Sequence, residues 1–157
     1  MTKRPGSLIQ VAYAVQKWLW RVIRPNTRGV KVMLFNTEGA IMLIRNSYGR
    51  SDQFVLPGGG VRPFEQLEAA AVREVHEELG LTAQELEFRS RHLSNAEGKR
   101  DEIHLFEALA HGEPKLDGLE LVEARWFHLD KIPEDTSPAT RRRIEEYLGE
   151  RQPDGSW

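Results

Sequence analysis

The sequence contains no cysteine. This absence excludes disulfides, zinc–thiolate sites, iron–sulfur clusters and thiol nucleophiles, and it fits a reducing compartment, so we expect a cytoplasmic protein. The chain also lacks an excess of charge of one sign, because 22 Lys and Arg stand against 24 Asp and Glu, for a net charge of -2. Without a basic footprint, bulk attraction to nucleic acid is not expected.

No apolar run reaches the ~18 residues that a transmembrane helix needs. The N-terminal segment comes closest, but Gln10, Gln16 and Lys17 interrupt it, so we expect no signal peptide either. Residues Ser7–Arg24 instead predict an amphipathic helix with a broad apolar surface. Such a helix would pack on its own domain, be buried in a homodimer or lie on a membrane surface, and we favour burial against protein.

Length and hydrophobic content predict one α+β domain, because 157 residues with 39% hydrophobic side chains suffice for one core. We expect this domain over residues 27–150, preceded by the helix within 1–26 and followed by a loose tail at 151–157. The arginines at 141–143 predict an exposed helix face with ion pairs. The predicted strands are Gly29–Asn36, Ala40–Asn46, Phe54–Leu56, Glu85–Leu93, Glu102–Ala110 and Leu121–Leu129, and the predicted helices are Pro63–Leu79 and 138–148.

The helix that ends at Leu79 carries an unusual acidic cluster. Helical spacing places Val72, Val75 and Leu79 on one face, and we expect that face to dock on the sheet. Three carboxylates are then expected to point the other way, namely Glu74, Glu77 and Glu78. Like charges at this spacing repel, and hard divalent cations such as Mg²⁺ bind carboxylates together with substrate phosphates. The alternative for an arbitrary E-x-x-E-E pattern is a solvated acidic surface.

The context of the cluster favours a metal site. The turn at residues 57–60, Pro-Gly-Gly-Gly, allows close backbone approach to a ligand. From Gly59 the chain continues through Glu65 and Arg73 to Leu81 with fixed residues at every expected spacing. This pattern resembles the Nudix box of the Nudix hydrolases without a departure. The resemblance covers about Gly29–Leu148 and implies an α/β/α sandwich with a mixed central sheet.

The resemblance also implies roles for individual residues. The implied metal ligands, for Mg²⁺ with Mn²⁺ as a substitute, are Glu74, Glu77, Glu78 and the carbonyl of Gly58. Arg73 and Glu65 are expected to orient the acidic side chains by ion pairing. A further acid, which binds metal or activates water, is expected before the late strand; Glu120 is the first candidate and Glu123 the second.

The implied reaction is the divalent-metal-dependent hydrolysis of a phosphoanhydride bond in a nucleoside diphosphate linked to another moiety. Bound metal neutralises the phosphates and lowers the pKa of a water molecule, and a carboxylate such as Glu77 or Glu120 assists. Two alternatives stay open, a non-catalytic nucleotide-sensing module and a pyrophosphohydrolase that acts on RNA 5′ ends. The intact acidic set favours the enzyme.

The substrate is less defined by the sequence. Some fifteen residues past the box, Ala96 and Glu97 stand where related hydrolases of ADP-ribose carry proline and those of dinucleoside polyphosphates carry tyrosine. Elimination therefore favours a nucleoside triphosphate or a related nucleotide. Candidate substrate contacts are Arg45, Tyr48, Phe54 and Phe127, although aromatic residues on strands are more often part of the core.

Overall fold

The computed structural model describes residues 11–12, 26–95, 100–116 and 120–157. Apart from residues 11 and 12, the predicted N-terminal helix lies outside this part, and so do the membrane-surface and homodimer contacts expected of it. In the described part no helix combines the length and hydropathy that a membrane crossing requires. The elements are β1 (Asn26–Phe35), β2 (Ile41–Asn46), α2 (Leu67–Leu79), β3 (Gln84–Ser94), β4 (Arg100–Leu109), β5 (Leu121–Phe127), η2 (Leu129–Lys131) and α3 (Pro138–Tyr147).

Five strands form one mixed sheet in the order β3-β4-β1-β2-β5. The central pair β1 and β4 is parallel, whereas β3 with β4 and β2 with β5 are antiparallel. β1 and β2 form the predicted hairpin, in which Phe35 faces Ile41. Gly39 sits in the turn at a φ of 75°, a left-handed conformation that glycine adopts without strain.

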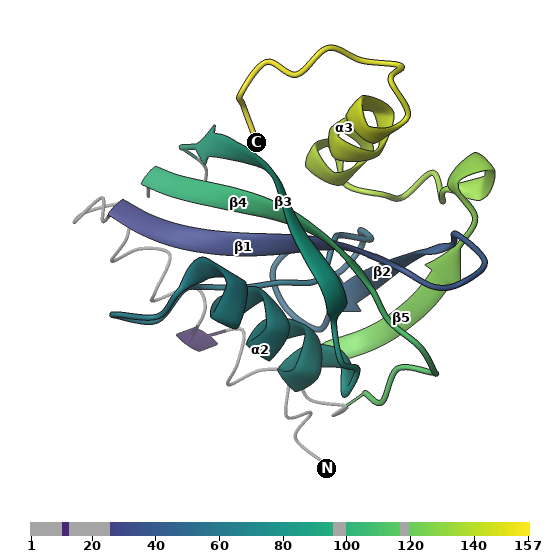
Figure 1. Ribbon diagram of the computed structural model, residues 1–157, viewed down its shortest axis with the longest axis horizontal. Helices are drawn as coiled ribbons and strands as arrows, with labels where there is room; N and C mark the ends of the chain where they lie inside the picture. Colours follow the sequence, from purple (N-terminus) through teal and green to yellow (C-terminus); the bar gives the residue numbers. More distant parts are fainter. Residues whose placement is uncertain (1–10, 13–25, 96–99, 117–119) are drawn as a thin grey trace.

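The two faces of the sheet hold two separate cores, as the alternation along β1 requires. Val30, Val32 and Leu34 belong to the core under α2. Met33 and Phe35 point the other way, into the core that includes Ile144 of α3. Figure 1 shows α2 and α3 on opposite sides of the sheet. The predicted mixed sheet with a helix on each face is therefore confirmed.

Helix α2 begins four residues later than predicted. Phe64 has a φ of 64°, which a helix does not allow, and the Glu65 N–H closes a turn on the Arg62 carbonyl at 3.1 Å. Pro63 therefore lies in a turn rather than in the first turn of the helix. The buried residues also differ from the prediction, since Val72 is 37% exposed while Ala70 and Ala71 are buried.

Because α2 buries another face than predicted, its carboxylates also point in another direction than expected. The buried stripe runs through Ala71, Val75 and Leu79, and at ~100° per residue Glu74 and Glu78 fall beside it rather than opposite. Both side chains are accordingly partly covered, and only Glu77 has an exposed residue surface. The acidic cluster faces the glycine turn at residues 58–60 instead of bulk solvent.

The short strand predicted at Phe54–Leu56 forms only single bridges. Val55 exchanges two backbone hydrogen bonds of 2.9 Å with Ile44, and Phe54 bridges to Thr136. The last helix starts as predicted, because the Ser137 hydroxyl caps it by accepting the Thr140 N–H at 3.2 Å.

The prediction of a loose C-terminal tail was wrong. The Trp157 N–H donates to the Leu93 carbonyl at 3.0 Å, and the indole packs on the core beneath α3. Arg143 was expected on an exposed face but is only 1% exposed. Its guanidinium lies 2.7 Å from His92 Nδ1 and donates to the Ser156 carbonyl at 2.5 Å. The tail thus satisfies a buried arginine, a long-range role that composition does not reveal.

Candidate active site

The glycine turn at residues 57–60 pairs with the first half of β1, on the edge that β2 leaves open. The Val30 N–H donates to the Gly59 carbonyl at 2.9 Å, and the Val32 N–H donates to the Pro57 carbonyl at 3.0 Å. Gly58 lies between them with a φ of 133°, and a Cβ there would lie 2.2 Å from the Val30 carbonyl oxygen. Only glycine fits, so the backbone of residue 58 is held at a fixed place beside α2.

Glu78 joins α2 to this turn. Its Oε2 accepts the Gly58 N–H at 2.8 Å. Burial raises the pKa of the Glu78 carboxyl to about 7, the charges of Glu74 and Glu120 also raise it, and Lys31 with the Gly58 N–H acts in the opposite direction. A buried carboxylate among other acids is an unfavourable charge that a bound cation stabilises.

Arg73 is the centre of the polar network around the turn. Its Nε and one terminal nitrogen donate to the two oxygens of Glu65 at 2.6 and 2.8 Å. The other terminal nitrogen donates to Glu74 at 2.7 Å and to Glu77 at 2.9 Å. The nitrogen that reaches Glu65 Oε2 also donates to the Gly60 carbonyl at 2.9 Å. One guanidinium thus orients three carboxylates and the glycine turn.

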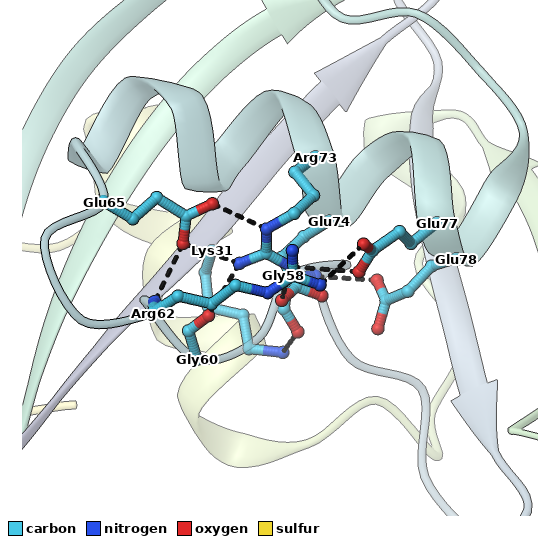
Figure 2. A network of polar contacts seen from close by, with 9 residues as sticks. All are labelled: Lys31, Gly58, Gly60, Arg62, Glu65, Arg73, Glu74, Glu77 and Glu78. Atoms are coloured by element: carbon cyan, nitrogen blue, oxygen red, sulfur yellow. Dashed lines mark hydrogen bonds and ion pairs between the residues drawn. The ribbon is translucent and has the colours of Figure 1, made fainter.

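Arg62 completes the network from the loop before α2. Its guanidinium donates to Glu77 at 2.9 Å, and its backbone N–H donates to Glu65 at 2.8 Å. Figure 2 shows the two arginines between Glu65 on one side and Glu77 on the other. The hydrogen bonds from Arg73, followed by the Arg62 N–H, lower the pKa of Glu65 to about 2. Glu65 is therefore ionised at neutral pH, and it holds Arg73 in place.

The chemistry of the donor atoms suits a hard divalent cation. The site offers carboxylate and carbonyl oxygens, the ligands that Mg²⁺ prefers, because Glu78 contacts Gly58 directly and Arg73 joins Glu74 to Glu77. One of these oxygens already has a cationic partner within the protein, since the Lys31 ammonium donates to the Gly58 carbonyl at 3.0 Å. Among the described residues no three acidic or histidine side chains form a group ready to hold a metal ion. Arg73 pairs with Glu74 and Glu77, and Arg62 pairs with Glu77. A metal ion bound here would require these carboxylates to share or leave their arginine partners.

The two candidates for the downstream acid lie in different surroundings. The Glu120 backbone carbonyl accepts the Ser47 N–H at 2.8 Å, and its charge raises the pKa of Glu78. Burial raises the pKa of Tyr48, and the charges of Glu120, Glu78 and Glu74 add to the increase. Glu123 instead pairs with Arg45 and Arg125, each at 3.2 Å. Glu120 and Tyr48 therefore belong to the electrostatic neighbourhood of the acidic cluster.

The other three predicted substrate contacts pack against one another. Phe54 is 2% exposed, and its ring meets Phe127 edge to face at 5.1 Å between centroids. Arg45 lies over the Phe54 ring at 4.2 Å and pairs with Asp135 at 2.6 Å. These contacts belong to the core on the α3 side and do not line the cavity next to the glycine turn.

A cavity of about 440 Å³ adjoins the glycine turn. It shares Lys31 and residues 58–60 with the acidic site, and its other walls come from the starts of β1 and β4 and from Val61. Asp101 lies in this wall and accepts a hydrogen bond from the Thr27 hydroxyl. An organic group in the cavity and phosphates on the turn would therefore be neighbours.

Sequence analysis missed Lys31 and Arg62. Lys31 is a charged residue in the run Val30–Phe35, in which each of the other five residues is buried. A single charge within an apolar strand can be recognised in the sequence and could have indicated a functional residue. Arg62 carries no such signal, because its role depends on the turn before α2. Both residues lie outside the identities that define the box.

The fold and the motif on α2 are those of hydrolases that act on phosphoanhydride bonds. The profile of the NUDIX domain matches residues 25–148, so the chain belongs to the Nudix hydrolase family. It is 32% identical over 130 residues to a Bacillus subtilis protein named "Putative 8-oxo-dGTP diphosphatase", covering 77% of this chain and 79% of that protein. It is 30% identical over 120 residues to the NAD-capped RNA hydrolase NudC of Salmonella paratyphi C, but spans only 45% of that protein.

Solved structures show the same fold. A MutT NUDIX hydrolase from Burkholderia pseudomallei superposes with a TM-score of 0.68 at 28% identity, covering 77% of this chain and 97% of that one. A MutT protein from Methanosarcina mazei gives 0.66 at 26% identity, with 81% and 95% covered. The predicted family and reaction class are confirmed.

Proposed function

We propose that the protein hydrolyses nucleoside triphosphates, modified ones included, to a nucleoside monophosphate and pyrophosphate. The observation that carries the proposal is the shared wall of the cavity and the acidic site. A nucleoside in the cavity would place its phosphates over the glycine turn, next to Glu78 and Lys31. The resemblance in sequence to the Bacillus subtilis relative supports a triphosphate, since that relative is named for 8-oxo-dGTP.

Each charged residue of the site then has a role in the reaction. Water attacks the α or the β phosphorus, and the bond from that phosphorus to the oxygen that bridges the two breaks. Its electron pair stays on this oxygen, which leaves with pyrophosphate after attack at α or with the nucleoside monophosphate after attack at β. We assign to Glu120 the proton of the attacking water, and the action of its charge on Glu78 and Tyr48 supports this assignment. Arg73 holds Glu74 and Glu77 in position, and Glu65 in turn fixes Arg73.

A divalent ion, Mg²⁺ or Mn²⁺, would be held by Glu74, Glu77, Glu78 and the Gly58 carbonyl. When bound it supplies neutralisation of the phosphate charge and lowers the pKa of water. The carboxylates of α2 contribute negative charge at this place, and the fixed backbone of Gly58 contributes a neutral oxygen. The same residues without a cation repel one another.

The proposal is tested by a phosphate-release screen with Mg²⁺ and with Mn²⁺. The panel contains ordinary and 8-oxo nucleoside triphosphates, nucleotide sugars and dinucleoside polyphosphates. Pyrophosphatase is added to the triphosphates to detect pyrophosphate, and alkaline phosphatase to the other two classes to release phosphate from their products. We expect triphosphates to be hydrolysed with the highest kcat/KM and to give pyrophosphate. Hydrolysis of nucleotide sugars alone, or release of single phosphate without pyrophosphatase, would contradict the proposal.

The NudC relatives suggest a second candidate substrate, the diphosphate bond of NAD or of an NAD-capped RNA. The chain spans 45% of those proteins, so the comparison concerns the domain and not the whole enzyme. NAD and a short NAD-capped RNA therefore belong in the panel. Turnover of these two above the triphosphates would favour the second candidate.

A further inference from the structure

Lys31 is a charged residue in the apolar interior strand of the sheet. The residues that follow it, from Val32 to Phe35, are buried, and so is Val30 before it. Lysine is rarely found in such an apolar run, and Lys31 itself is only partly buried. Two backbone carbonyls hold the ammonium, since the Lys31 Nζ donates to Leu56 at 2.9 Å and to Gly58 at 3.0 Å.

The second of these carbonyls is the one that our proposed function assigns to the metal. The same Gly58 residue donates its N–H to Glu78 at 2.8 Å. Lys31 and Glu78 thus approach one peptide residue from its two polar ends, and the lysine charge acts on the carboxylate. Figure 2 shows the Lys31 chain ending at this residue, on the side away from Arg73.

A divalent ion and an ammonium cannot share these oxygens without cost. Mg²⁺ binds its oxygen ligands at about 2.0–2.1 Å, whereas the ammonium already lies 3.0 Å from the Gly58 oxygen. Like charges at such separations repel strongly at the dielectric of a protein surface. The ammonium therefore has to move when an ion binds, and the neighbouring cavity, which Lys31 also lines, offers the room.

We propose that Lys31 is a resident cation of the site, which occupies the Gly58 carbonyl until a divalent ion takes this oxygen and which then binds the phosphate oxygens of the substrate. The inference rests on the proposed function for the metal ligands and for the substrate phosphates. An ammonium is a compact charge with three donors on a flexible chain, so it suits a residue that changes partners. Its movement links metal loading to the arrival of the substrate.

The first test measures Mn²⁺ binding to the nucleotide-free protein by titration calorimetry. In Lys31→Met the aliphatic chain is kept and the competing charge is lost, so we expect Mn²⁺ to bind about tenfold more tightly than in the wild type. Lys131→Met is the matched control, because it removes the same charge from an exposed residue of η2. It should leave the Mn²⁺ affinity within about twofold.

Two results of this titration would overturn the proposal. One is a Lys31→Met protein that binds Mn²⁺ no more tightly than the wild type. The other is a tightened site that survives in the double variant Lys31→Met/Glu78→Gln, because the ion would then lie elsewhere. Thermal melting of each variant shows that the fold is retained, and none of these measurements depends on turnover.

The second test is kinetic and uses the triphosphate found in the substrate screen. At saturating Mg²⁺ we expect Lys31→Met to raise KM by about tenfold with a smaller change in kcat, since a charge-assisted contact to phosphate is lost. An unchanged KM would overturn the phosphate contact. Failure of the wild type to hydrolyse any nucleotide would instead overturn the proposed function, and the Mn²⁺ titration would still decide whether Lys31 competes with the metal.

Discussion

Arg73 and Glu65 form a two-pronged ion pair, with Nε 2.6 Å and a terminal nitrogen 2.8 Å from the two carboxylate oxygens. The pair spans the turn before α2 and the middle of that helix. Because Glu65 holds two donors of the guanidinium, the remaining terminal nitrogen is directed at Glu74 and Glu77. The orientation of the acidic cluster therefore depends on a residue that need not touch the substrate.

We expect Arg73→Lys to lower kcat/KM and Mn²⁺ affinity by about 10–100-fold, the usual effect of losing a residue that orients metal ligands. Lysine keeps the charge but cannot make the planar two-pronged contact. Steady-state kinetics and calorimetry measure the two effects. Arg89→Lys is the control, since Arg89 pairs with Glu107 on the exposed side of β3; a loss of equal size there would contradict the role of Arg73.

Glu77→Gln should reduce turnover by at least about 100-fold and leave the melting temperature nearly unchanged. Its side chain is 47% exposed, so the fold does not depend on it, while the proposed metal site loses a charged ligand. Phosphate release and thermal melting are the measurements. Glu68→Gln, an exposed residue in the first turn of the same helix, should change neither. Wild-type turnover in Glu77→Gln would remove Glu77 from the site.

The box itself could be predicted from the sequence because its residues are local. Glu65, Arg73 and Glu77 all lie within one turn and one helix, and their spacing fixes which of them meet. The alternation along β1 likewise predicts two faces, and the structure places Val32 and Met33 in separate cores. Periodicity and short spacing are properties of the chain that folding preserves.

The errors arose where distant segments decide the outcome. Glu78 was expected to point outward, but the glycine turn lies against α2 and supplies the Gly58 N–H as its partner. Phe54 was a candidate for base stacking, yet Phe127 and Arg45 enclose it from other strands. Arg143 is buried because the chain end returns to it. None of these contacts has a signal in the local sequence.

Gly58→Ala should lower the free energy of unfolding by about 2–4 kcal/mol, through backbone strain and a steric clash. The new Cβ would lie 2.2 Å from the Val30 carbonyl oxygen, at a φ of 133° that L-residues rarely adopt. Urea denaturation measures the change. Gly60→Ala is the matched control, because nothing lies within 4 Å of a Cβ there. Equal stability of the two variants would show that the turn adapts.

Trp157→Ala should destabilise the protein by about 1–3 kcal/mol, as expected for loss of a partly buried ring. The indole lies beside His92 at 5.8 Å and under the Arg143 guanidinium at 5.6 Å. Activity below the melting transition should stay at the wild-type level, because the tail packs on the α3 side of the sheet. Arg151→Ala, an exposed neighbour, is the control for urea denaturation. An unchanged unfolding midpoint in Trp157→Ala would contradict the packing role.

Glu78 predicts how the stability of the metal-free protein changes with pH. Its folded-state pKa is about 7, raised from 4.5 chiefly by burial, so the native state holds a proton that the unfolded state releases earlier. Its contribution to stability is complete below pH ~4.5 and is lost as pH rises through ~7.

The variant Glu78→Gln tests this dependence, because glutamine keeps an acceptor for the Gly58 N–H without ionising. Above pH 7 without metal, its free energy of unfolding should exceed that of the wild type by about 1–3 kcal/mol. We expect the difference to shrink toward pH 5 in urea titrations with a chelator, and saturating Mg²⁺ should reverse it. A difference that does not depend on pH would show that Glu78 ionises as an ordinary surface acid.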